Sequence, residues 1–293
     1  MGIDNHFLRF LIQSSKNGVD FTHTATIGRQ NWYRMSPQLL QATFKKEGVS
    51  LSTEQAQTLF AEDGIYTEAL FRFLGATTVE SLDYSNYENA THIVDMNLRI
   101  SDQLHNKYTV VIDGGTLEHI FNFPQAITNC MNMVAIGGHF IGLSPANNFF
   151  GHGFYQFSAE LFFRIFEPSN GFVAEKVLLV EDEAFGQGWF VVTDPVSARA
   201  RVTLMSATPA YLYVLGRKLD ARQPFSHPPY QSDYVAIWEG EDTALKRSSI
   251  SKSKAANIRN FVKLLIPKKA KHWLRQTLFP GPRSHPDHYK AVR

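Results

Sequence analysis

Three side chains suited to proton transfer occupy two short polar segments of the chain. Glu118 and His119 follow an apolar run, and His152 lies in a segment rich in glycine and aromatic residues. Because imidazole titrates near neutral pH, a histidine at a ligand site can take a proton from a hydroxyl group. We predict Glu118, His119 and His152 as catalytic residues. The alternative is structural, with Glu118 accepting from backbone N–H groups at a helix start and His119 packed against its neighbours.

A strand–helix–strand unit is expected to position these side chains. Residues 109–112 and 139–143 are short apolar runs, each followed by turn-forming residues. Pro124 fits the first turn of the connecting helix, where its missing N–H costs nothing. Gly137-Gly138 is expected to end that helix.

Strands joined by such a crossover run parallel and bind ligands beyond their carboxyl ends. Residues 113–119 and 144–148 follow the two strands, so both segments should face one site. The aromatic segment 147–157 is predicted to roof it, with Asn147, His152 and Gln156 offering hydrogen bonds. A lid that makes no contact with a ligand is the alternative.

Composition and length indicate a globular protein with a sizeable core. The chain has 293 residues, of which 44% are hydrophobic and 19% charged. Its single cysteine, Cys130, allows no internal disulfide and suits a reducing compartment. No signal peptide is recognised, and no run reaches the roughly 18 apolar residues of a membrane span. We therefore expect a cytoplasmic location. Nothing in the cysteine and histidine spacing indicates a metal.

Charge is distributed unevenly along the chain. Residues 1–240 hold 16 Lys and Arg against 24 Asp and Glu, whereas residues 241–293 hold 13 against 3. The acidic body argues against a nucleic-acid partner. The basic end is either a solvated extension or an amphipathic segment on an anionic membrane, at the inner face of the bilayer.

Outside the central unit, helical and apolar β-branched stretches alternate. This alternation predicts a doubly wound α/β sheet that ends in an antiparallel pair. The expected strands cover residues 21–27, 78–82, 91–94, 109–112, 139–143, 173–180, 200–205 and 212–215, and the expected helices cover 4–16, 36–46, 52–60, 67–74, 158–166 and 255–265.

The central unit resembles the later half of the class I S-adenosylmethionine-dependent methyltransferase fold. The matching features are the strand Val110–Ile112, the turn Leu117-Glu118-His119, the Gly137-Gly138 pair and Pro145-Ala146-Asn147. His152 and Phe157-Ser158 match some small-molecule members at the start of the next helix. The resemblance covers residues 21–180 and implies a Rossmann-like, mostly parallel seven-stranded sheet with an antiparallel last strand.

The resemblance also implies where S-adenosylmethionine would bind. Asp83, at the end of the second strand, matches the acid that binds the ribose. Asp95-Met96, after the third strand, match the acid and apolar residue at the adenine. The cofactor-binding residues expected are Gly28, Arg29, Asp83, Asp95, Met96, Asp113 and Gly114. Asp83 and Asp95 could instead be turn formers, which are common at strand ends.

The loop after the first strand departs from the family pattern of an acid followed by three spaced glycines. Only Gly28 remains, Thr26 replaces the acid, and Arg29-Gln30 replace small residues. Arg29 could pair with the carboxylate of the cofactor. Alternatively, the loop fills the pocket, and the protein has lost the cofactor.

The resemblance implies an N-terminal helical cap at 1–20, a methyltransferase-like domain at 21–220 and a basic extension at 221–293. The implied activity is methyl transfer to a hydroxyl group of a small molecule or glycan. The alternative is a non-catalytic binding protein of the same fold, associated with a membrane surface.

Overall fold

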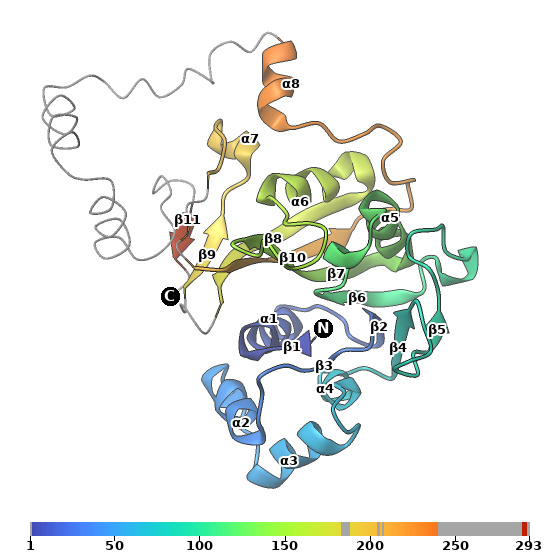
Figure 1. Cartoon of the computed structure of the whole chain (residues 1–293), viewed down its shortest axis with the longest axis vertical. Coiled ribbons are helices and arrows are strands. Elements are labelled where there is room, and N and C mark those ends of the chain that lie inside the picture. The colour runs from blue at the N-terminus through green and yellow to red at the C-terminus, as the bar shows by residue number, and fades with distance from the viewer. Residues whose placement is uncertain (1, 183–187, 204–205, 207, 240–288, 292–293) are drawn as a thin grey trace, which may run out of the picture.

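A twisted sheet of nine described strands forms the centre of the molecule (Figure 1). The computed structural model describes residues 2–182, 188–203, 206, 208–239 and 289–291. The strand order is β11-β9-β8-β10-β7-β6-β2-β4-β5. The strands are β2 (His23–Ile27), β4 (Thr78–Asp83), β5 (His92–Ile93), β6 (Tyr108–Gly114), β7 (Val134–Asn147), β8 (Phe172–Glu181), β9 (Trp189–Val192), β10 (Ala210–Lys218) and β11 (Tyr289–Ala291).

The strand directions give the sheet its fold class. β5, β4, β2, β6 and β7 are parallel to one another, and β10 is antiparallel to both β7 and β8. The first five strands thus follow the Rossmann order 3-2-1-4-5. The predicted doubly wound, mostly parallel sheet with an antiparallel strand near its end is confirmed. The count differs, because β9 and β11 extend the seven predicted strands at one edge.

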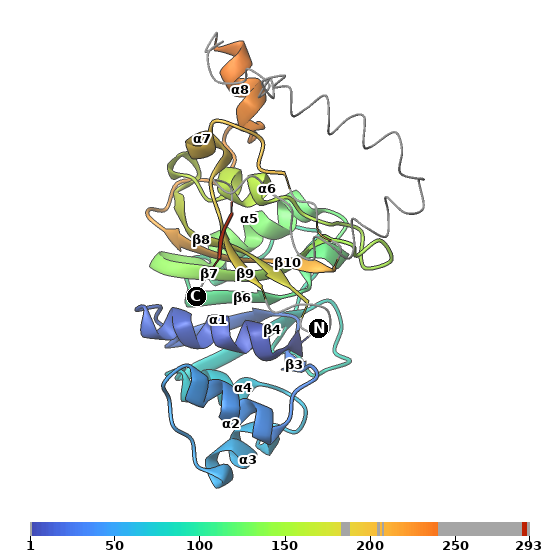
Figure 2. The same cartoon turned by 90° about the vertical axis from the view of Figure 1, so that its left-hand side faces the viewer.

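Helices cover both faces of the sheet (Figures 1 and 2). The four N-terminal helices lie on one face, and the later ones lie on the other. They are α1 (Asn5–Lys16), α2 (Pro37–Lys46), α3 (Thr53–Ala61), α4 (Glu68–Phe73), α5 (Phe123–Met133), α6 (Ala159–Ile165), α7 (Pro195–Ala198) and α8 (Ser232–Trp238). A small separate sheet pairs β1 (Gly2–Ile3) with β3 (Asn31–Trp32).

Alternation along the strands divides the core in two. On β6, Val110 and Ile112 pack with the N-terminal helices, whereas Val111 packs with α5 and α6. Phe7 and Phe10 of α1 contact the ring of Tyr213 on β10. The first helix, expected as part of a cap, therefore contributes directly to the core on its face.

Local sequence signals place most helix starts correctly. The Asp4 carboxylate caps α1, and the Ser36 and Ser158 hydroxyls cap α2 and α6. Pro124 lies in the first turn of α5, as expected. Since these caps are short-range hydrogen bonds, the sequence alone identifies them.

Three predictions of secondary structure are wrong. The helix α5 ends at Met133, and Gly137-Gly138 lie inside β7. A Cβ on Gly138 would approach the Thr109 carbonyl oxygen to 2.6 Å, so this glycine permits close strand pairing. Residues 200–203 form no strand, and β10 pairs instead with β7 and β8. The helix α8 lies in a segment for which no helix was predicted.

The predicted helix at 255–265 lies outside the described residues. Residues 289–291 pair with β9 at the sheet edge. Among the described residues, no helix is both long and apolar enough to span a bilayer.

Candidate functional site

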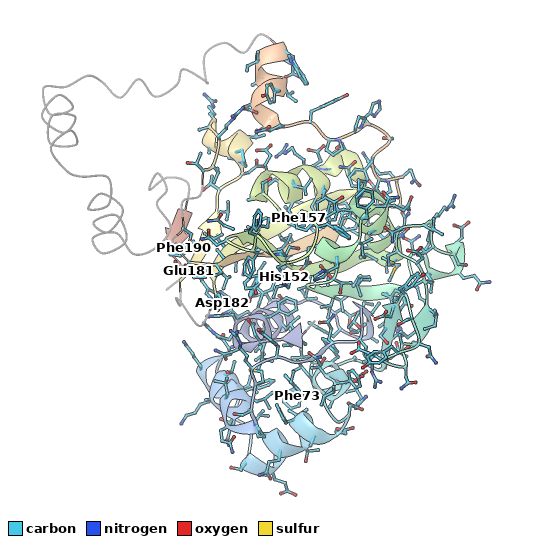
Figure 3. The ribbon with its side chains drawn as sticks, in the orientation of Figure 1. Phe73, His152, Phe157, Glu181, Asp182 and Phe190 are labelled. Atoms are coloured by element: carbon cyan, nitrogen blue, oxygen red, sulfur yellow. The ribbon has the colours of Figure 1, made fainter. Side chains whose placement is uncertain are left out.

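A pocket of about 350 Å³ opens beyond the carboxyl ends of β6 and β7. Figure 3 labels His152 and Asp182 near this edge of the sheet. The pocket brings together the loops after β6, β7 and β8 and the N-terminal segment. Its lining residues are Gly2, Asp4, Tyr33, Arg34, Gly114, Gly115, Glu118, His119, Leu143, Phe149, His152, Asp182, Pro209 and Tyr211.

Two acids are buried near the carboxyl end of β6, and one of them, Glu118, lines the pocket. The other, Asp113, is the last but one residue of β6, and its Oδ1 accepts from the backbone N–H groups of Thr116 and Leu117 at 2.9 and 3.3 Å. Glu118 follows in a 3-10 turn, Leu117–His119, and is 1% exposed. Burial raises the pKa of both carboxyl groups, and the charge of Asp113 raises the pKa of Glu118 further.

Among the described residues, no other residue donates a hydrogen bond to the Glu118 carboxylate. The Nε2 of the His152 ring lies 3.4 Å from Oε1. This ring is an ion-pair partner only when it is protonated.

The two histidines lie side by side in the pocket wall. The His119 and His152 rings meet edge to face, with centroids 4.9 Å apart. Burial, followed by the nearby His152, lowers the pKa of His119. A neutral imidazole at neutral pH can accept a proton, so this arrangement suits a general base.

The segment after β7 is fixed by hydrogen bonds to the turn that carries Glu118. The N–H groups of Phe154 and Tyr155 donate to the Glu118 carbonyl oxygen at 2.8 and 3.3 Å. The Tyr155 hydroxyl donates to the Phe121 carbonyl oxygen at 2.6 Å. Phe149 and His152 from this segment line the pocket, whereas the predicted ligand contact Gln156 instead accepts from the Phe149 N–H.

The loop after β2 is closed by its own side chains. The Arg29 Nε donates to Glu68 at 2.5 Å, its Nη1 donates to the Glu88 carbonyl oxygen at 3.0 Å, and its guanidinium lies 3.8 Å from the centre of the Tyr66 ring. The Arg29 guanidinium is therefore bound to other residues of the protein. It does not line the pocket, and neither does Gly28.

Gln30 was noted from the sequence only as a replacement for a small residue of the family loop, and no contact was predicted for its side chain. It is 2% exposed, and its Nε2 donates to the Ile27 and Gly28 carbonyl oxygens. A Cβ on Gly114 would fall 2.2 Å from its Oε1. Gln30 therefore lies over Gly114, at the switch point between β2 and β6.

The acids at the next two strand ends lie apart from the pocket. Asp83 accepts from the Ser85 N–H, and Asp95 accepts from the Asn97 N–H and side-chain amide. Both therefore use one oxygen in a turn, as the alternative interpretation held. Met96 is 5% exposed within the core.

Asp4, Arg34, Asp182 and Tyr211 are among the lining residues that were not predicted as site residues. The Arg34 Nη1 lies 3.8 Å from the Asp182 Oδ1. These four residues come from segments far apart in the sequence. No local motif in the sequence could have grouped them.

No family model and no curated protein sequence matches the chain. Solved structures with a similar course include a didemethyltoxoflavin N1-methyltransferase from Burkholderia thailandensis, with 11% identity and a TM-score of 0.38 over 73% of this chain and 78% of that chain. The N-methyltransferase NodS from Bradyrhizobium japonicum has 12% identity and a TM-score of 0.38 over 73% and 96%. A 16S rRNA adenine N1-methyltransferase from Catenulisporales acidiphilia has 9% identity and a TM-score of 0.35 over 76% and 95%.

Because these TM-scores are low, the fold is assigned from the strand order and not from the superposition. Five parallel strands in Rossmann order, followed by an antiparallel strand between the fifth and sixth, agree with the predicted topology. The chain thus has the Rossmann-like fold that its resemblance to class I methyltransferases implies.

Proposed function

We propose that the protein transfers a methyl group from S-adenosylmethionine to a hydroxyl group of a small molecule or glycan. The observation that carries this proposal is the convergence of Glu118, His119 and His152 on one pocket beyond the central parallel strands. Doubly wound sheets bind their ligands in this position, next to the switch point between β2 and β6.

The strand-end acids fit the nucleoside part of the cofactor. Asp83 ends the second strand of the Rossmann order, Asp95 follows the third by two residues, and each holds its turn through one carboxylate oxygen. The other oxygen of each can accept from a ribose hydroxyl or an adenine amino group. Asp113 and Gly114 would lie beside the cofactor at the end of β6.

The cofactor would supply an electrophilic methyl group, and the side chains of the pocket would prepare its acceptor. His119, whose pKa is lowered by partial burial, would accept the hydroxyl proton as the oxygen attacks. His152 and Glu118 would orient the acceptor. Phe149 and Tyr211, whose rings lie 4.5 Å apart, would contact its apolar face and exclude water.

Gln30 favours a second candidate function, a binding protein that no longer uses the cofactor. Its buried amide lies over Gly114, where the glycine-rich loop of the family approaches the methionine part. In this case Glu118, His119 and His152 would bind a ligand without transferring a methyl group to it.

Calorimetric titration with S-adenosylmethionine and S-adenosylhomocysteine separates the two functions. The first function predicts binding in the micromolar range, about −8 kcal/mol, that is lost in Asp83→Ala and retained in Asp102→Ala. Asp102 is an exposed acid paired with Arg99 away from the pocket, so it is a matched control. Absence of binding to either compound by the folded wild-type chain would refute methyl transfer and leave the second function.

A further inference from the structure

The side chains of Glu118, His119 and His152 each offer one ligand atom, and these atoms lie within 4.8 Å of one another. Two imidazole nitrogens and one carboxylate oxygen are a ligand set that divalent transition metals use in proteins. We infer that these three residues bind one such ion, with Zn²⁺ as the best match, at the base of the pocket.

Glu118 is the observation that points to a ligand independently of the cluster itself. Its carboxylate is 1% exposed, and both of its oxygens lack a hydrogen-bond donor among the described residues. A buried polar group without a partner costs free energy, and a buried carboxylate costs more than a neutral group. A cation between Glu118 and the two histidines would compensate this cost.

The spacing of the ligand atoms suits a small tetrahedral ion. Zinc bonds of about 2.0–2.2 Å at tetrahedral angles place neighbouring ligand atoms roughly 3.3–3.6 Å apart. The Glu118 Oε1 and the His152 Nε2 lie 3.4 Å apart. The His119 nitrogen lies within 4.8 Å of both atoms and would move closer to them to bind the same ion.

The backbone around Glu118 holds the site in place. Gly153 has a φ of 69°, and a Cβ there would approach the Glu118 carbonyl oxygen to 2.8 Å. The hydrogen bonds from Phe154 and Tyr155 to that oxygen fix the segment that carries His152. The contacts depend on a glycine at this position, and they join the two ligand-bearing segments before any ion binds.

Three protein ligands leave a coordination position open, as in catalytic rather than structural zinc sites. That position would face the pocket, whose lining includes Arg34 and Tyr211. A hydroxyl oxygen of a ligand could occupy it, and the bound ion would then promote loss of the hydroxyl proton in place of His119, because a nitrogen that binds the ion cannot also accept a proton. Oxygen-only ligand sets suit Mg²⁺ and Ca²⁺ better, and the two imidazoles argue against those ions.

The test is calorimetric titration of the full-length chain, freed of metal with a chelator, with ZnCl₂ and separately with MgCl₂. Co²⁺ added to the same protein gives a visible absorption spectrum that reports its coordination. No S-adenosylmethionine is present, so failure of this inference and failure of methyl transfer are distinguishable. We expect one Zn²⁺ per chain and no comparable binding of Mg²⁺.

Variants assign the ligands. His152→Ala removes a half-exposed ligand, and Glu118→Gln keeps the shape of the buried one. Loss of a group that only supports a ligand weakens metal binding about 10–100-fold, so each variant should weaken Zn²⁺ binding by at least about 100-fold. His227→Ala, an exposed histidine far from the pocket in sequence, and the triple variant H272A/H285A/H288A should bind as the wild type does.

Thermal unfolding without metal checks that each variant is folded. Wild-type binding that survives in folded His152→Ala would overturn the inference. So would binding that disappears in the triple variant, because the ion would then lie among the last histidines of the chain. Absence of a Co²⁺ spectrum in the wild type would overturn it equally.

Discussion

At the scale of single residues, the contact between Gln30 and Gly114 decides how open the switch point is. Gln30 replaces a small residue of the family loop, and its amide folds back onto the Ile27 and Gly28 carbonyl oxygens. The space that this side chain fills exists because Gly114 has no Cβ. Two residues far apart in the sequence thus close one part of the crevice together.

Substituting Gly114 should therefore destabilise the protein through Gln30. A Cβ at Gly114 would lie 2.2 Å from the Gln30 Oε1, whereas one at Gly151 would meet no heavy atom within 4 Å. Gly114→Ala should lower the free energy of unfolding by about 1–3 kcal/mol, and Gly151→Ala by less than about 0.5 kcal/mol. Chemical denaturation measures both values.

The double variant Gln30→Ala/Gly114→Ala provides the control. Because the clash is gone, Gly114→Ala should cost about 1–3 kcal/mol less in the Gln30→Ala background than in the wild type. Additive costs would show that Gln30 does not occupy the space over Gly114.

At the scale of elements, one carboxylate joins three strands near the edge of the sheet. The Glu80 Oε2 on β4 accepts from Lys107 before β6, from Tyr108 on β6 and from His92 on β5, at 2.6, 2.6 and 2.7 Å. Burial alone would raise the pKa of Glu80, but these hydrogen bonds outweigh it and lower the pKa to about 2.

The Glu80 cluster should make folding sensitive to acid. A carboxyl group whose pKa is lower in the folded than in the unfolded chain stabilises the fold above its unfolded pKa. That stabilisation is lost as pH falls from about 4.5 towards 2. Since the Glu80 side chain is 22% exposed, we expect about 1–2 kcal/mol after allowing for solvent screening.

Urea unfolding of wild type and Glu80→Gln between pH 7 and pH 3 measures this effect. The difference between them should be constant above pH 5 and shrink below it. Tyr108→Phe, which removes one donor, should show a smaller difference with the same pH dependence. A difference that does not change down to pH 3 would contradict this account.

At the scale of the whole molecule, the end of the chain returns to the sheet. Residues 289–291 form β11 and pair with β9, so an edge strand follows the basic segment 241–288. Deleting the entire C-terminal region would expose the edge of β9, and exposed edges favour association. A test of the basic segment must therefore preserve β11.

We expect the basic segment to bind anionic membranes through its charge. Each Lys or Arg near such a surface contributes about 1 kcal/mol, so K268S/K269S/K271S should weaken vesicle binding on the order of 100-fold. Sedimentation with phosphatidylserine vesicles measures this, and neutral vesicles are the control. Equal sedimentation of variant and wild type would identify the segment as a solvated extension.

The sequence by itself determined the class of fold and most helix starts. Strand periodicity depends on residues within a few positions of each other, and so do the caps at Asp4, Ser36 and Ser158. Such signals can be read from the sequence without a structure. The grouping of Glu118 with His119 followed from their adjacency. Their meeting with His152 was expected from parallel strands that end at one edge.

The tertiary structure alone decided which side chains occupy the crevice. The Arg29 guanidinium contacts Glu68, Tyr66 and Glu88, so these residues decide whether it can pair with a ligand. The position of the Gln30 side chain depends on the absence of a Cβ at Gly114. The end of α5 was also decided by pairing, because Gly137-Gly138 lie within β7 against Thr109. These contacts join residues separated by tens of positions, and no local pattern encodes such distances.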